Sequence, residues 1–164
     1  MSEVTVRRAL GADGSLLLGL VDGLADYEQL PRPDAAAHER LLADGFGAAP
    51  RFHCLLAFVA ARPAGYALYF DTYSSFLARP TLFLEDLFVL PDLREHGAGS
   101  ALFRAVAAEA LAGGCGRMEW QVLGWNVLAI DFYDGVNARS LDEWRSYRLD
   151  GPALTAAASG RRTA

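Results

Sequence analysis

The sequence contains no lysine. All fifteen of its basic residues are arginine and stand against twenty acidic residues, which gives a net charge of -5 at pH 7. Mechanisms that need a lysine amine are therefore excluded: Schiff-base enzymes, lysine-containing phosphate loops and Ser-Lys hydrolases. A mildly acidic chain also has no basic footprint for nucleic acid or an anionic membrane, and it favours a cationic ligand if the acids cluster.

Cysteines and long apolar runs are scarce as well. Cys54 and Cys115 show none of the paired spacings of a zinc site, so we expect reduced thiols and no metal. The longest apolar run, residues 54–61, is too short to span a bilayer, and residues 1–10 lack the apolar stretch of a signal peptide. We expect a cytoplasmic protein with no membrane partner.

What the chain does have is enough apolar sequence for one core. It has 164 residues, 52% of them hydrophobic, which predicts a single domain over 1–164. Periodicity and breakers predict an α+β fold, in which residues 153–164 form an irregular tail. The predicted strands are 4–7, 52–60, 65–73, 81–89, 118–123 and 144–149, and the predicted helices are 16–24, 34–42, 99–112 and 127–134.

A glycine loop separates the predicted strand 81–89 from the predicted helix 99–112. Gly97 and Gly99 let the backbone curl until several N–H groups point to one spot at the helix N-terminus, which suits an anion such as pyrophosphate. An ordinary turn explains two glycines as well. A dinucleotide fingerprint would need glycine where Leu102 stands, and a P-loop would need a lysine.

The pattern Arg-x-x-Gly-x-Gly at residues 94–99 resembles the coenzyme A signature of GNAT-type N-acetyltransferases. Further segments resemble, in the same order, the diamine (spermidine/spermine) N-acetyltransferase subfamily: residues 24–28, 41–47, 52–55, 84–89, 125–126 and 131–133. The resemblance implies a mixed, mostly antiparallel central sheet with splayed central strands, flanked by helices. It also implies acetyl-CoA as cosubstrate and a homodimer.

The resemblance assigns acetyl-CoA binding to the end of the strand, the loop and the following short helix. The residues concerned are Leu87, Phe88, Val89, Arg94, Glu95, His96, Gly97, Ala98, Gly99, Ser100, Asn126 and Tyr133. Two departures stand out. Glu95 replaces the glycine usual in the subfamily, which puts a carboxylate near the phosphates unless it faces solvent or pairs with Arg94. The insertion at residues 138–143 is also shorter than in the subfamily.

Two neighbouring acids interrupt an otherwise apolar stretch, residues 82–89. Glu85 and Asp86 would face opposite sides of a regular strand. One interpretation is that a bulge, a sheet edge or an arginine partner accommodates them. The other is that Glu85 faces the cleft as base and amine receptor, the role that the resemblance implies, with Asp86 a second acid nearby.

The chemistry explains why a carboxylate is wanted. An alkyl ammonium has a pKa near 10.4, so roughly one molecule in a few thousand is the neutral nucleophile at pH 7. A carboxylate in a desolvated cleft can accept that proton through water. Backbone N–H groups at residues 87–89 would stabilise the oxyanion, and Tyr133 would protonate the departing thiolate. Phe132 and Tyr133 could equally be core aromatics, but Asn126, whose side chain can hold the pantetheine amide, favours the functional interpretation.

The substrate end is predicted from the resemblance at Tyr27 and Glu28, and from position at Glu119 and Trp120. With Glu85 and Asp86 they would form an acidic slot for a small cationic amine. The first hypothesis is acetyl transfer to a primary amine of a di- or polyamine by direct attack in a ternary complex. The alternatives are an acetyltransferase for an aminoalkyl amino acid (thialysine-like) or another small amine, and a non-catalytic acyl-CoA-binding protein.

Overall fold

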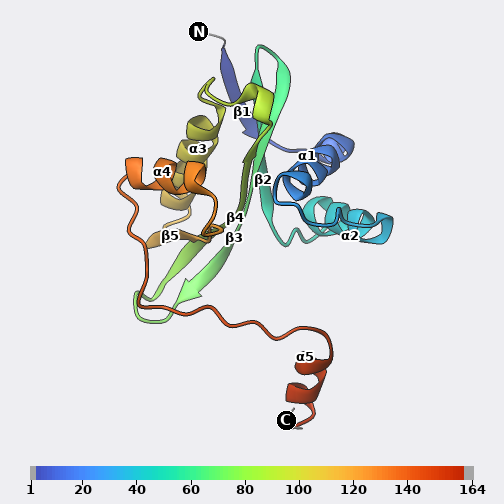
Figure 1. Cartoon of the computed structure of the whole chain (residues 1–164), viewed down its shortest axis with the longest axis vertical. Helices are drawn as coiled ribbons and strands as arrows, with labels where there is room; N and C mark the ends of the chain where they lie inside the picture. The colour runs from blue at the N-terminus through green and yellow to red at the C-terminus, as the bar shows by residue number, and fades with distance from the viewer. Residues whose placement is uncertain (1–2, 161–164) are drawn as a thin grey trace. The chain divides into compact units, whose positions relative to one another are not determined.

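A computed structural model describes residues 3–160 of the chain. The chain divides into two compact units, Met1–Gln121 and Val122–Ala164, which are described separately (Figure 1). That residues 1–164 form a single domain stays a prediction. No helix among residues 3–160 is long and apolar enough to cross a membrane.

The first unit is built on a five-stranded sheet. Its strands lie in chain order, β1-β2-β3-β4-β5; the first three pairs are antiparallel and β4 with β5 is parallel. Pairing of β4 with β5 ends at Leu84 and Trp120, so the last residues of β4 continue beyond it. This confirms the mixed, mostly antiparallel sheet. The strands are β1 (Val4–Arg8), β2 (His53–Val59), β3 (Arg62–Ser74), β4 (Arg79–Val89) and β5 (Arg117–Trp120).

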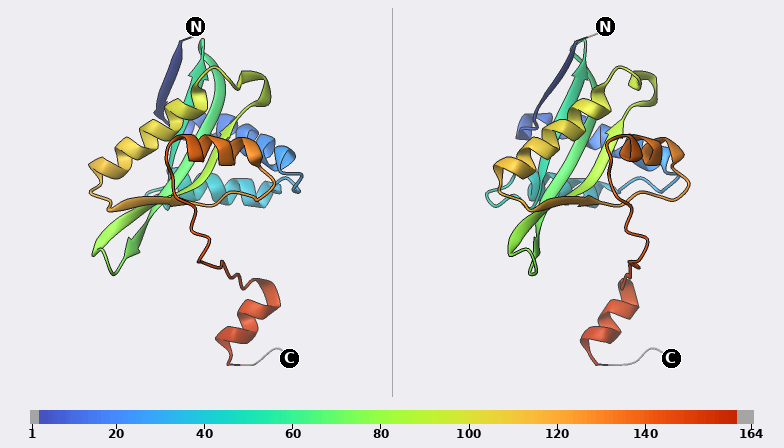
Figure 2. Two further views of the ribbon diagram at one scale, coloured as in Figure 1. Left: turned by 60° about the vertical axis from the view of Figure 1, so that its left-hand side comes forward. Right: turned by 90° about the vertical axis from the view of Figure 1, so that its left-hand side faces the viewer.

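Helices cover both faces of this sheet (Figure 2). On one face α3 (Ala98–Ala112) buries Leu102 and Val106 against Leu55 and Leu84. On the other face α1 (Gly14–Tyr27) and α2 (Ala35–Phe46) pack over the second apolar cluster. Successive side chains of a strand alternate between faces, so the central strands contribute to both clusters.

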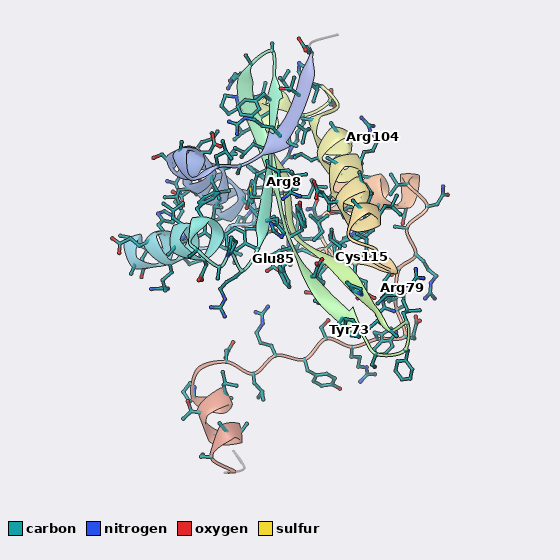
Figure 3. The ribbon with its side chains drawn as sticks, turned by 180° about the vertical axis from the view of Figure 1, so that it is seen from behind. Arg8, Tyr73, Arg79, Glu85, Arg104 and Cys115 are labelled. Carbon is teal, nitrogen blue, oxygen red and sulfur yellow. The ribbon has the colours of Figure 1, made fainter. Side chains whose placement is uncertain are left out.

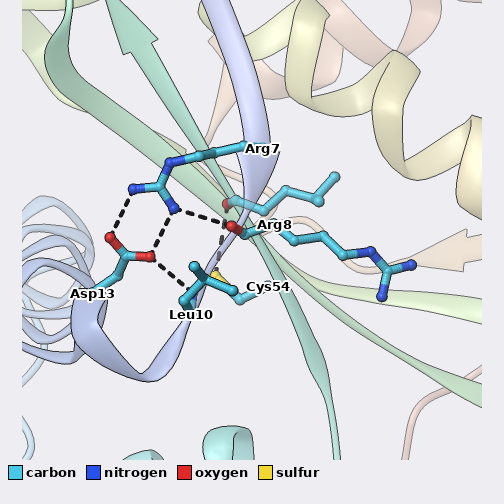
Figure 4. A network of polar contacts seen from close by, with 6 residues as sticks. Arg7, Arg8, Leu10, Asp13 and Cys54 are labelled. Atoms are coloured by element: carbon cyan, nitrogen blue, oxygen red, sulfur yellow. Dashed lines mark hydrogen bonds and ion pairs between the residues drawn. The ribbon is translucent and has the colours of Figure 1, made fainter.

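Polar contacts fix the helix starts. Asp34 caps α2, accepting a hydrogen bond from the Ala37 N–H at 2.7 Å. Asp13 closes the short helix η1 (Gly11–Asp13) before α1 and binds the Arg7 guanidinium with both carboxylate oxygens, each at 2.7 Å (Figure 4). The hydrogen bond from Arg7 lowers the pKa of Asp13 to about 2. This pair ties the start of α1 to β1.

The second unit corrects two predictions. It holds α4 (Val127–Gly135), as expected, and α5 (Gly151–Ala158), where an irregular tail was predicted over 153–164. Residues 161–164 of that predicted tail lie outside the described residues. Asp150 and Pro152 are helix-start residues before an alanine-rich run, and this propensity outweighs the missing periodicity. The strand predicted at 144–149 is absent from the described structure, because a strand needs a partner and these residues join no sheet.

Candidate active site

The predicted anion loop lies between β4 and α3. After β4 the chain forms the short helix η2 (Pro91–Leu93), and Gly97 then takes φ +86° as the N-cap of α3. A left-handed backbone is readily adopted by glycine, and it turns the chain into the helix. The first N–H groups of α3, those of Ala98, Gly99 and Ser100, have no earlier helical carbonyl to bind. This donor set fits the pyrophosphate of coenzyme A.

Glu95 is the one residue of the loop that disfavours an anion. It is exposed and takes φ +67°, a strained conformation for a residue with a Cβ atom. Of the two arrangements considered for this carboxylate, the structure has the solvent-exposed one, and Arg94 forms its contacts elsewhere. His96 is also exposed and its Nδ1 lies 2.8 Å from the Arg94 carbonyl oxygen, a contact within the loop.

Arg94 turns toward α1. Its Nε donates to the Val89 carbonyl oxygen at 3.1 Å, and its guanidinium carbon lies 4.3 Å from the centre of the Tyr27 ring. This is a cation–π contact. The predicted anion loop is therefore in direct contact with Tyr27, the predicted substrate residue at the end of α1. Nothing in the sequence pattern indicates this contact.

A β-bulge separates the two acids of β4. Leu84 pairs with Tyr69 and Asp86 with Leu68, so Glu85 is the extra residue without a cross-strand partner. Leu84 and Leu87 both pack on the α3 face, whereas Phe88 packs with the α1 cluster. The bulge thus reverses the alternation after residue 85. Glu85 is exposed, midway along β4, while Asp86 is partly buried (Figure 3).

Asp86 lies in an acidic environment. Burial raises the pKa of Asp86 to about 6; a hydrogen bond from the Tyr66 hydroxyl at 3.0 Å opposes this effect, and the charges of Glu85 and Glu28 add to it. The charges of three of the predicted acids, Glu28, Glu85 and Asp86, therefore act on one another. A carboxylate with a pKa near 6 is a better proton acceptor at neutral pH than an ordinary one.

The two predicted residues of β5 differ in their surroundings. Glu119 is paired with Arg117 on its own strand, at 2.9 Å between Nε and Oε1, so its charge is compensated. The Trp120 ring packs edge-on against Phe103 of α3, with ring centres 5.4 Å apart, as part of the α3-side core. The Tyr27 ring is on the other face, 6.3 Å from Phe88. Trp120 is therefore a core contact of α3 in this unit.

Asn126 and Tyr133 belong to the second unit. Asn126 is the N-cap of α4, and its side-chain oxygen accepts from the Ala129 N–H at 3.2 Å. Tyr133 lies in the last turn of α4 with its ring 5.4 Å from that of Phe132. Burial raises the pKa of Tyr133 to about 12, so the phenol keeps its proton at neutral pH. A role for either residue stays a prediction.

The loop, the bulged strand and the partly buried acid describe a class: an α+β domain in which a strand that carries a carboxylate leads into a candidate anion loop. Residues 19–135 match the model of the acetyltransferase (GNAT) family. The chain belongs to this family and is an acetyltransferase that acts on amines.

Relatives with assigned activities match most of the chain or about half of it. Thialysine N-epsilon-acetyltransferase of Sus scrofa is 38% identical over 94% of this chain and 96% of its own. L-ornithine N5-acetyltransferase NATA1 of Arabidopsis thaliana is 46% identical over 57% of this chain and 41% of its own. Spermidine/spermine N(1)-acetyltransferase-like protein 1 of Homo sapiens is 29% identical over 94% of this chain and 24% of its own.

Solved structures agree on the fold. An integron cassette protein from the mobile metagenome of V. cholerae has a TM-score of 0.79 at 25% identity, covering 96% of this chain and 98% of its own. Aminoglycoside N-acetyltransferase AAC(6')-Iy in complex with CoA has a TM-score of 0.71 at 23% identity, covering 91% of this chain and 96% of its own.

Two features of the site could not be read from the sequence. One is Tyr66 on β3, which donates to Asp86; the other is the contact between Arg94 and Tyr27. Both depend on which residues of separate elements become neighbours. The bulge itself had a sequence signal, the pair of acids in an apolar strand, and was one of the interpretations considered.

Proposed function

We propose that the protein transfers the acetyl group of acetyl-CoA to a primary amine of a small di- or polyamine by direct attack in a ternary complex. The observation that carries this proposal is the buried Asp86 carboxyl on the strand that leads into the anion loop, with the charges of Glu85 and Glu28 acting on it. Three carboxylates at one place attract an ammonium group and disfavour an anionic substrate there. Acetyl-CoA supplies the thioester whose acyl carbon the amine attacks.

In this proposal Arg94–Ser100 and the backbone of Leu87–Val89 bind the cosubstrate, and Asn126 assists. Glu85, exposed on the bulge, and Glu28 hold the ammonium. Asp86 is the proton acceptor in this proposal, since burial raises its pKa toward neutrality. The ammonium first gives one proton to Asp86, and the neutral amine attacks the thioester carbon. The nitrogen–carbon bond is then in place and the carbon–sulfur bond breaks. Tyr133 gives its proton to the departing thiolate and takes up the second proton that the acylated nitrogen loses.

An aminoalkyl amino acid is the second candidate substrate. Thialysine acetyltransferases are among the relatives that match nearly the whole chain. A carboxylate on the substrate needs a cation, and Arg94 places its guanidinium over Tyr27, the neighbour of Glu28. In this second proposal the substrate's carboxylate binds the Arg94 guanidinium, an ion pair that a polyamine cannot form. A zwitterionic amino acid with a terminal amine would then be preferred over a polyamine.

A thiol-release assay tests the function. Acetyl-CoA is incubated with spermidine, spermine, putrescine, ornithine or thialysine, and free CoA is measured. We expect Glu85→Gln and Tyr133→Phe each to lower turnover more than acetyl-CoA binding. If Arg94 holds a carboxylate, Arg94→Gln lowers kcat/KM for ornithine more than for putrescine, which is ornithine without its carboxylate. CoA binding without thiol release with any amine would instead show an acyl-CoA-binding protein.

The proposal also includes a homodimer, based on the resemblance. Light scattering coupled to size-exclusion chromatography measures the mass directly. A value near 35 kDa, twice the 17.7 kDa of one chain, is expected, and a value near that of one chain contradicts the dimer.

A further inference from the structure

The hydroxyl of Tyr66 is an internal hydrogen-bond donor aimed at the candidate base. The Tyr66 side chain is completely buried, and its Oη lies 3.0 Å from Asp86 Oδ2. Among the described residues whose interactions shift the pKa of Asp86, Tyr66 alone lowers it. A buried hydroxyl without a partner would cost free energy, so each group satisfies the other.

The fold fixes this pair through the sheet. Tyr66 is directly opposite Phe88, and Leu68 is opposite Asp86, so Tyr66 is the diagonal neighbour of Asp86 across β3 and β4. Asp86 and Phe88 are two residues apart on β4 and so share a face, and the bulge at Glu85 turns that face toward the α1 cluster. The Tyr66 ring packs edge-on against Phe88, at 6.4 Å between centres, and Phe88 contacts Tyr27. The aromatic contacts leave the phenol little freedom to turn away.

Two neighbouring acids oppose the ionisation of Asp86: Glu28, which follows α1, and Glu85, the preceding residue on β4. The Cys54 thiol of β2 is affected in turn, because burial and the charge of Asp86 raise the pKa of Cys54 to about 12. Neither glutamate can donate a hydrogen bond in its ionised form. The Tyr66 O–H is thus the group that favours the ionised form against burial and two neighbouring acids.

We propose that Tyr66 is a positioning residue for acetyl transfer: its phenol holds the Asp86 carboxylate in place and keeps it ionised, and so ready to accept the ammonium proton. This inference rests on the proposed function, in which Asp86 is the acceptor. It assigns a role to a residue that touches neither substrate in the proposed arrangement and that acts through Asp86.

The test is the pH profile of kcat/KM for Tyr66→Phe, with Tyr69→Phe as matched control. Tyr69 is on the same strand and almost fully buried, but it packs in the α3-side cluster, on the face away from Tyr66. Tyr66→Phe keeps the aromatic ring that packs against Phe88, and thermal melts check that both variants are folded. Thiol release is followed from pH 5 to 9 with saturating acetyl-CoA and with ornithine or spermidine, whichever is the better substrate of the wild type.

We expect the acidic limb of the wild type near pH 6 to move upward by about one pH unit in Tyr66→Phe. Activity would then fall about five-fold at pH 6 and stay unchanged at pH 9. Titration of the amine shapes the profiles of all variants alike. Superimposed profiles for Tyr66→Phe and wild type, or an equal shift in Tyr69→Phe, would overturn the proposal.

Carbon-13 NMR titration of the Asp86 carboxyl separates this inference from the proposed function. The signal is assigned by its loss in Asp86→Asn. If no amine supports thiol release, the proposed function fails, yet the Asp86 titration is still expected to move upward in Tyr66→Phe. If transfer occurs but the titration does not move, the role of Tyr66 is refuted. Should Tyr66→Phe not fold, 3-fluorotyrosine is incorporated in place of tyrosine. Its more acidic phenol is a stronger donor and should move the Asp86 titration downward, and an unmoved titration would refute the role of Tyr66 as well.

Discussion

Replacing Asp86 by asparagine should stabilise the fold at neutral pH while removing activity. Burial raises the pKa of Asp86 from 3.8 to about 6, so the folded protein binds this proton more tightly than the unfolded chain does. The stability that comes from the neutral carboxyl is fully present below about pH 4 and is lost as the pH rises through about 6. The difference of about 2 pH units, at about 1.4 kcal/mol per unit, amounts to about 3 kcal/mol above pH 7.

Asparagine is a good probe of this effect, because it resembles the protonated carboxyl and its amide oxygen still accepts from Tyr66. Urea unfolding is followed by tryptophan fluorescence at pH 4.5, 6 and 7.5. We expect Asp86→Asn to exceed the wild type by about 3 kcal/mol at pH 7.5 and by less than about 1 kcal/mol at pH 4.5. Thiol release by the variant should fall by at least two orders of magnitude.

Asp13→Asn is the control with the opposite sign. The hydrogen bond from Arg7 lowers the pKa of Asp13 to about 2. The stability that the ionised Asp13 carboxylate gives to the fold is therefore present above about pH 4 and is lost as the pH falls toward 2. Asp13→Asn should therefore destabilise the protein at pH 7.5. The reasoning about Asp86 is refuted if Asp86→Asn is no more stable than the wild type at pH 7.5, or if its gain is the same at pH 4.5.

Two further predictions concern Gly65 and Glu95 at the site, and a third, at Gly19 within α1, serves as a comparison. A Cβ atom on Gly65 would lie 2.2 Å from the Phe88 carbonyl oxygen and 3.0 Å from the Val89 Cα. Gly65→Ala should therefore destabilise the fold by about 2 kcal/mol. It should also raise KM for acetyl-CoA, because it displaces the backbone proposed to bind the cosubstrate. Gly19→Ala, at an exposed helical position with open space, should instead stabilise it by about 0.5–1 kcal/mol in the same urea assay. Glu95→Gly removes a carboxylate and a strained φ from the anion loop, so calorimetry should show tighter CoA binding by a few-fold; unchanged or weaker binding would contradict a role of this loop in holding phosphate.

The outline of the fold follows from local pattern. The spacing of Leu17 and Leu20 predicts a helix with one buried face, and α1 buries both residues. The alternation in β1 likewise predicts a strand with one face turned inward, and β1 shows that pattern. The loop at residues 94–99 was also predictable, since the left-handed turn at Gly97 is a property of that residue. The prediction at 144–149 was wrong because strand propensity says nothing about a partner.

The site depends instead on one irregular residue. In a regular strand, Asp86 and Phe88 would have faced α3, and the carboxyl would have been buried in an aliphatic core without a donor. The bulge at Glu85 moves both side chains to the α1 face, where Tyr66 is the diagonal neighbour of Asp86. The same shift leaves Glu85 exposed. Two adjacent acids that are costly in a hydrophobic strand thereby acquire different environments, one solvated and one buried with a pKa near 6. Because a change of one residue in strand register reverses every side chain beyond it, an insertion or deletion between Leu84 and Leu87 should remove the proposed base even if the sheet still forms.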